Sequence, residues 1–109
     1  MGYAYYGVLA VDPEKYSKKD LKPWFDKWKD YFDDVISEET RTVFIVDWAK
    51  GAFELFEEFE SIYALRDEDC YLESNTYGYI ILGESNDDTE QSGEPWEFNI
   101  ELNRSIEVY

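Results

Sequence analysis

Three patterns of hydrophobic and polar residues separate the predicted strands from the predicted helices of this chain: continuous apolar runs, two-residue alternation, and three- to four-residue spacing. Residues 3–11 and 42–49 are almost uniformly apolar and rich in β-branched or aromatic side chains, so both are predicted to be buried strands. Asp47 is the single charge of the second run, and we expect it at a strand end or cap. Residues 77–84 predict a third strand of the same kind.

Two other segments show the three- and four-residue spacing of an amphipathic helix. In residues 20–36 the apolar positions are Leu21, Trp24, Phe25, Trp28, Phe32, Val35 and Ile36. Asp20 is favoured as the N-cap, because a start at Ser17 would place Pro23 too far inside the helix and remove a backbone hydrogen bond. In residues 52–66 the apolar face holds Ala52, Leu55, Phe56, Phe59, Ile62 and Tyr63. Opposite it lie Glu54, Glu57 and Glu58, with Glu60 on the flank.

The rest of the chain predicts loops and one more strand. Residues 67–76 are acidic and loop-like, with a short strand considered at 70–73, and residues 85–95 have turn chemistry throughout. Residues 96–108 alternate with period two, which predicts a strand that forms a hairpin with the preceding one. The predicted order is therefore β-α-β-α-β-β. We expect a single α+β domain over residues 1–109, with a mostly antiparallel sheet of about four strands and two amphipathic helices on one face.

Composition indicates that the chain folds and that its charge serves a purpose other than folding. Hydrophobic residues make up 44% and aromatic residues 19% of it, unlike disordered acidic chains. The net charge is −16, from 26 acids and 10 bases. Residues 1–50 hold 10 acids and 8 bases, a net of −2, whereas residues 51–109 hold 16 acids and 2 bases, a net of −14. Self-repulsion of this size destabilises a compact state, and the seven lysines of the first half argue against a halophile's uniform acidity.

Most catalytic and metal chemistries are excluded by residue type. The chain has no histidine and one cysteine, Cys70, so histidine-dependent nucleophilic systems and a zinc site are ruled out. No glycine-rich phosphate loop occurs. Paired carboxylates remain formally open as a glycosidase-like or metal site, but a catalytic acid needs an apolar pocket to raise its pKa. The acids of residues 87–94 do not follow the spacing of a calcium loop. We predict no enzyme activity, no catalytic residues, no metal and no cofactor.

The setting is predicted to be the cytoplasm. A lone cysteine fits a reducing compartment, and the sequence has neither the pattern of a signal peptide nor an apolar run long enough for a membrane span. The negative field repels phosphates, so direct nucleic-acid binding is not expected.

The candidate site is a partner-binding surface made of the uncompensated acids of the second half. Neighbouring helical carboxylates lie about 5–6 Å apart, which is the length scale of phosphates along a nucleic-acid backbone. Tyr71, Tyr77 and Tyr79 flank these acids and would anchor a partner if they were exposed. The acids of the site are Glu54, Glu57, Glu58, Asp67, Glu68, Asp69, Glu73, Glu84, Asp87, Asp88, Glu90 and Glu94, and Tyr71 and Tyr77 complete the set.

In composition the chain resembles the small acidic inhibitors that phages and mobile elements use against host DNA-acting proteins. The resemblance implies electrostatic mimicry of nucleic acid, directed at a basic nucleic-acid-binding protein such as a restriction, CRISPR or repair enzyme, in the host cytoplasm if a phage encodes it. Two alternatives stay open: an immunity protein or antitoxin that caps a basic nuclease toxin, and a structural or adaptor protein whose acids only solvate the surface. Whether the protein is a monomer or a homodimer also stays open.

Overall fold

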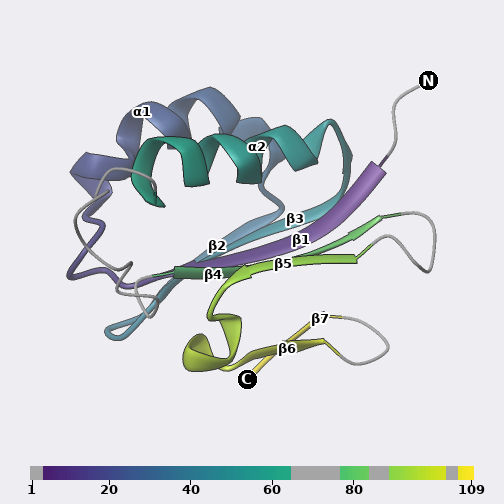
Figure 1. Cartoon of the computed structure of the whole chain (residues 1–109). Coiled ribbons are helices and arrows are strands. Elements are labelled where there is room, and N and C mark those ends of the chain that lie inside the picture. Colours follow the sequence, from purple (N-terminus) through teal and green to yellow (C-terminus); the bar gives the residue numbers. More distant parts are fainter. Residues whose placement is uncertain (1–3, 65–76, 84–88, 103–105) are drawn as a thin grey trace.

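A five-stranded antiparallel sheet forms the centre of the molecule (Figure 1). The computed structural model describes residues 4–64, 77–83, 89–102 and 106–109. The sheet has the order β2-β3-β1-β4-β5. Its strands are β1 (Ala4–Val11), β2 (Asp34–Ser37), β3 (Thr42–Lys50), β4 (Tyr77–Gly83) and β5 (Thr89–Gly93).

Both faces of this sheet are covered, so the domain has three layers. The helices α1 (Lys18–Trp28) and α2 (Ala52–Phe59) lie together on one face (Figure 1). A small hairpin of β6 (Ile100–Leu102) and β7 (Ile106–Val108) lies against the other face, preceded by the 3-10 turn η3 (Pro95–Phe98). The predicted α+β class, the antiparallel sheet and the two helices on one face are confirmed.

The first four strands and the two α-helices have a recognisable topology. They run β1-α1-β2-β3-α2-β4, and β1 lies between β3 and β4, the two strands that α2 connects. This order is that of a split β-α-β, or ferredoxin-like, arrangement. Because such a scaffold hosts many unrelated functions, the topology alone assigns none.

Burial on both faces explains why β1 is uniformly apolar. Leu9 and Val11 belong to the core between sheet and helices, whereas Val8 and Ala10 belong to the core between sheet and hairpin. Alternate residues of a strand point to opposite faces, so each face of β1 needs its own apolar set.

The predicted start of the first helix is wrong. Ser17 is the N-cap, and it forms a capping box with Asp20: the Asp20 N–H donates to Ser17 Oγ over 3.2 Å, and the Ser17 N–H donates back to Asp20 Oδ2 over 3.3 Å. Pro23 lies inside the helix and has no N–H to donate to the carbonyl of Lys19; both residues are exposed.

The predicted end of that helix is also wrong. α1 stops at Trp28, the 3-10 turn η1 (Lys29–Tyr31) follows, and β2 then pairs with β3. Val35 still packs on the helix-side core, but it does so from a strand. The apolar residues after Trp28 have helical spacing in the sequence, but in the structure they lie in a turn and a strand.

The second helix is confirmed as far as Ala64. α2 ends at Phe59 and continues into the π-helical turn η2 (Glu60–Ala64). The remaining predicted residues of this helix, 65–66, and the short strand considered at 70–73 lie outside the described residues.

The C-terminal prediction is wrong in its strand pairing. Residues 89–93, expected in a turn, form β5 and pair with β4. Residues 96–98, expected in the last strand, belong to η3, and Asn99 then takes a left-handed conformation with φ +59. The two strands that follow pair with each other instead of with β4.

Candidate functional site

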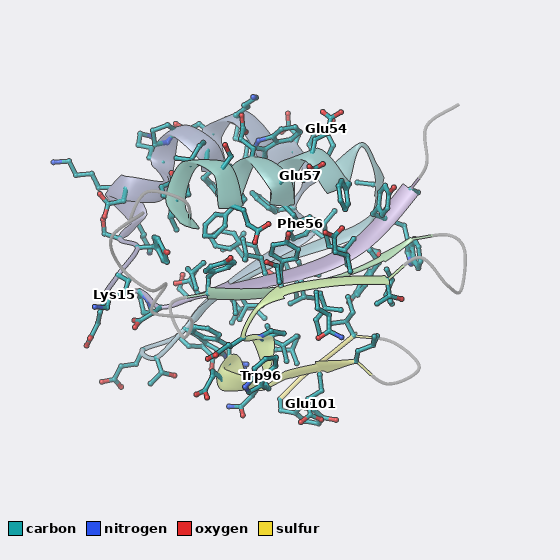
Figure 2. All side chains as sticks on the ribbon, in the orientation of Figure 1. Lys15, Glu54, Phe56, Glu57, Trp96 and Glu101 are labelled. Carbon is teal, nitrogen blue, oxygen red and sulfur yellow. The ribbon has the colours of Figure 1, made fainter. Side chains whose placement is uncertain are left out.

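Helix α2 presents Glu54 and Glu57 on its outer side. Phe56 and Phe59 on its inner side are fully buried. Figure 2 shows Phe56 pointing to the sheet and the two glutamates on the outer side of the helix layer. The close approach depends on Gly7, because a Cβ there would lie 2.4 Å from the ring of Phe56. Packing therefore fixes the face on which the two carboxylates stand.

Glu58 is engaged within the protein rather than displayed. Its Oε1 lies 2.6 Å from Lys27 Nζ, and its Oε2 accepts a hydrogen bond from the indole N–H of Trp28. Hydrogen bonds from Lys27 and then from Trp28 lower the pKa of Glu58. Glu58 thus links α2 to the end of α1. Glu58 is partly exposed, but its charge is paired with Lys27, whereas Glu54 and Glu57 do not take part in this contact.

Glu60 has a structural role that the sequence analysis missed. Its carboxylate accepts hydrogen bonds from Tyr79 over 2.7 Å and from Tyr77 over 2.8 Å, and from the hydroxyl of Ser92. The signal in the sequence was its spacing of four from Phe56, which places it toward the inner face of the helix.

Two of the three tyrosines expected to flank the acids are described, and both lie in the core. Tyr77 is 5% exposed and Tyr79 is 1% exposed, so neither meets the condition of exposure under which it would anchor a partner. Burial, with the neighbouring Glu60 carboxylate, raises the pKa of Tyr77 to about 12 and raises the pKa of Tyr79 as well.

The remaining described acids of the predicted site lie on or after the edge strand β5, where Glu90 pairs with Ile81 on the face of the sheet that the helices cover. Glu90 is exposed on the edge strand β5, and Glu94 follows that strand and is half-buried. Glu101 is exposed on β6, on the opposite side of the sheet from α2 (Figure 2). The structure therefore does not gather the described acids on one face, and the outer helix layer and the hairpin layer each carry some. Eight residues of the predicted set lie outside the described residues: Asp67, Glu68, Asp69, Tyr71, Glu73, Glu84, Asp87 and Asp88.

In the described part of the first half, ion pairs engage Lys27, which binds Glu58 as above, and Lys22 and Arg41. Lys22 pairs with Asp26 over 3.1 Å along α1. Arg41 pairs with Glu38 over 2.7 Å, and its other nitrogens donate to the carbonyl groups of Phe98 and Tyr109, each over 2.6 Å. Across the described part of the chain, Glu54 and Glu57 have no ion-pair partner.

An open cavity of about 500 Å³ lies between α1 and the edge of the sheet formed by β2 and β3. Leu21, Phe25, Val35 and Phe44 contribute apolar walls, and charged residues of both signs also line it. None of the predicted partner-binding residues lines this cavity. The candidate surface is therefore a convex helix face rather than a pocket.

Comparison of the chain with known proteins provides no family, since no family model, curated protein or solved structure matches it. Within the described ranges, no three Asp, Glu or Cys side chains are grouped so that they could hold a metal ion. No helix in those ranges has the length and apolar character to cross a membrane.

Proposed function

We propose that this protein is a small acidic inhibitor that binds a basic nucleic-acid-binding protein by electrostatic mimicry of nucleic acid. The observation that carries the proposal is the uncompensated charge of residues 51–109, with 16 acids against 2 bases. Two of these acids, Glu54 and Glu57, are exposed on the packed helix α2. A partner with a groove lined by Lys and Arg side chains would exchange its phosphate contacts for these carboxylates.

The rigid support of α2 favours such binding. The helix is held by fully buried Leu55, Phe56 and Phe59, so little order has to be gained on association. Long-range attraction between opposite charges would steer the encounter and make it fast, and added salt would weaken it. A restriction, CRISPR or repair protein has the required basic surface.

An immunity protein or antitoxin that caps a basic nuclease toxin is the second candidate. The arrangement of the acids favours it: Glu54 and Glu57 form a compact pair, and Glu101 lies on the opposite side of the sheet. Such a pair would match one active site more readily than a long groove for duplex nucleic acid.

The test uses the partner captured by the immobilised protein from an extract of its native host. Mimicry predicts that duplex DNA displaces the protein from this partner and that affinity falls steeply with salt. A nuclease whose active site is capped would lose catalytic activity while the complex persists. If neither DNA nor salt affects the complex, the protein is an adaptor and the proposal is wrong.

A pair of matched variants locates the contact. The double variant Glu54→Gln/Glu57→Gln removes two charges from α2, and we expect its affinity for the captured partner to fall by about tenfold or more. The control Asp30→Asn/Glu39→Gln removes two exposed charges from the first half, so that both double variants have the same net charge. Equal losses in both variants would show that only net charge matters and that α2 is not the contact face. Glu58 is left intact, because its replacement would also break the link to α1.

A further inference from the structure

A bulge in β3 places a large aromatic side chain in an unusual backbone conformation. The pairing of β1 with β3 shifts between Tyr5, opposite Ala49, and Gly7, opposite Val46. Two residues of β3, Asp47 and Trp48, therefore lie opposite the single residue Tyr6 of β1. Trp48 has a left-handed backbone with φ +50, a region in which a residue with a side chain is disfavoured by roughly 1–2 kcal/mol.

The bulge displays Trp48 rather than burying it. Its side chain is 48% exposed, and its ring contacts the ring of Tyr6 with centroids 5.9 Å apart. Tyr6 is half-buried and packs at the edge of the core under the hairpin, so it backs the indole with a fixed surface. An exposed tryptophan that is supported from behind can be contacted without reordering.

Two carboxylates complete this surface, which we call the bulge patch and define as Tyr6, Asp33, Asp47 and Trp48. Both aspartates are exposed. Asp33 is held next to β3 by a hydrogen bond of 2.7 Å from its backbone N–H to the carbonyl of Ile45. Burial, and then the negative charges of Asp47 and Asp33, raise the pKa of Tyr6.

We propose that the bulge patch binds an arginine side chain from a basic segment of the partner. The indole of tryptophan is the best aromatic face for a cation, and a guanidinium group can stack on it while its N–H groups pair with a carboxylate. Lysine lacks the planar fork and would fit less well. Trp, Tyr and Arg are also the residues most enriched at the energetic centres of interfaces.

Charge complementarity selects this occupant over a second copy of the chain. The net charge is −16, so two copies repel each other, whereas an arginine-rich segment is attracted to both the aspartates and the whole molecule. The inference rests on the proposed basic partner, but it assigns the contact to residues of the first half that composition alone did not single out.

The experiment uses two probe peptides, hexa-arginine and hexa-lysine, titrated into the intact protein and followed by the indole N–H signals in nuclear magnetic resonance spectra. We expect hexa-arginine to shift the Trp48 signal more than the signal of Trp96, and to bind more tightly than hexa-lysine. Trp48→Gly should weaken hexa-arginine binding about 2- to 30-fold, the range of a cation–π contact. Glycine accepts the left-handed backbone, so this variant keeps the bulge.

Two further variants control the result. Asp47→Asn keeps the shape of the bulge patch and should also weaken hexa-arginine binding. Trp96→Ala removes the other exposed tryptophan, which is 57% exposed and stands next to Glu97, and it should leave the affinity unchanged. Near-identical spectra of the remaining residues in each variant would establish that the fold is retained.

The outcomes separate this inference from the proposed function. If both peptides bind equally well and Trp48→Gly has no effect, the bulge patch is overturned while a general affinity for basic chains stands. If neither peptide binds at low salt, both proposals are overturned. If the protein is a dimer that Trp48→Gly converts to a monomer, the bulge patch is an interface between copies, and the arginine proposal is wrong.

Discussion

The hydroxyl of Tyr79 donates a hydrogen bond to the carboxylate of Glu60 over 2.7 Å, which ties the helical turn after α2 to the middle of β4. The same carboxylate accepts from Tyr77 over 2.8 Å and from Ser92 on β5. A glutamate that lies against an apolar sheet is tolerated because each contact is a charge-assisted hydrogen bond. These bonds attach η2, the turn that continues α2, to strands β4 and β5.

Replacing this carboxylate by an amide should destabilise the protein, because the charge is lost and one of the two acceptor oxygens becomes an NH2 donor. We expect Glu60→Gln to lower the free energy of unfolding by about 1.5–3 kcal/mol, the magnitude of a hydrogen bond to a charged group. Urea unfolding measures the change. Glu57→Gln is the matched control, since its carboxylate is exposed on the same helix and its loss should change stability by less than about 0.5 kcal/mol.

The pairing itself is tested by a double-mutant cycle with Tyr79→Phe. Residues in direct contact show interaction energies of about 0.5–3 kcal/mol, so the double variant should be less destabilised than the sum of the single variants. Strict additivity would contradict a direct bond between Glu60 and Tyr79.

Alkaline pH should unfold the protein through the same residues. The pKa of Tyr77 is raised to about 12 and that of Tyr79 is raised too, whereas a tyrosine in the unfolded chain has a pKa of about 10. The neutral tyrosines therefore stabilise the fold fully below about pH 10, and this contribution is lost as the pH rises toward 12. Urea unfolding at a series of alkaline pH values measures the loss. A free energy of unfolding that stays constant over this interval would contradict the buried hydroxyl groups.

Acid should weaken the link between the helices. The pKa of Glu58 is lowered by Lys27 and Trp28, so its stabilising contribution is present above the unfolded pKa of about 4.3 and is lost as the pH falls through the folded value. Glu58→Gln should be less stable than the natural protein at neutral pH, and the difference should vanish in strong acid. Glu54→Gln is the control, because that residue lacks an ion-pair partner in the described ranges and its replacement should not produce the same pH-dependent loss.

The attachment of the C-terminal hairpin should depend on Gly78. A Cβ at this residue of β4 would lie 2.3 Å from the backbone nitrogen of Pro95 and 2.5 Å from its Cα, so the backbone of η3 would have to move. We expect Gly78→Ala to destabilise the protein by about 1–3 kcal/mol, the usual penalty for overpacking.

Hydrogen exchange distinguishes this local effect from general unfolding. Amides of β6 and β7 should lose protection first in Gly78→Ala, while those of the paired strands β1 and β3 should remain protected. Equal loss of protection throughout the sheet would show that the close contact between Gly78 and Pro95 does not hold the hairpin.

Local pattern was sufficient to predict β1, β3 and β4, which are continuous apolar runs, and α2, whose apolar residues follow the helical period from end to end. It failed where pairing with a distant strand outweighed local preference. Val35 and Ile36 fit a helical spacing, but pairing with β3 places them in β2. The sequence of β5 reads as a turn, yet its backbone pairs with β4 at the edge of the sheet, where strand formation depends more on pairing than on side chains.

The sequence determines the net charge, whereas the structure determines what each charged side chain does. The excess of acids in residues 51–109 follows from the sequence alone, because a net charge is a sum that does not depend on geometry. The roles of Glu54, Glu58 and Glu60 followed only from the tertiary structure. They stand within two turns of one helical segment, and only the contacts of α2 with α1 and with the sheet leave the first exposed while engaging the other two. Helical periodicity describes one segment at a time, whereas exposure depends on which neighbouring elements cover it.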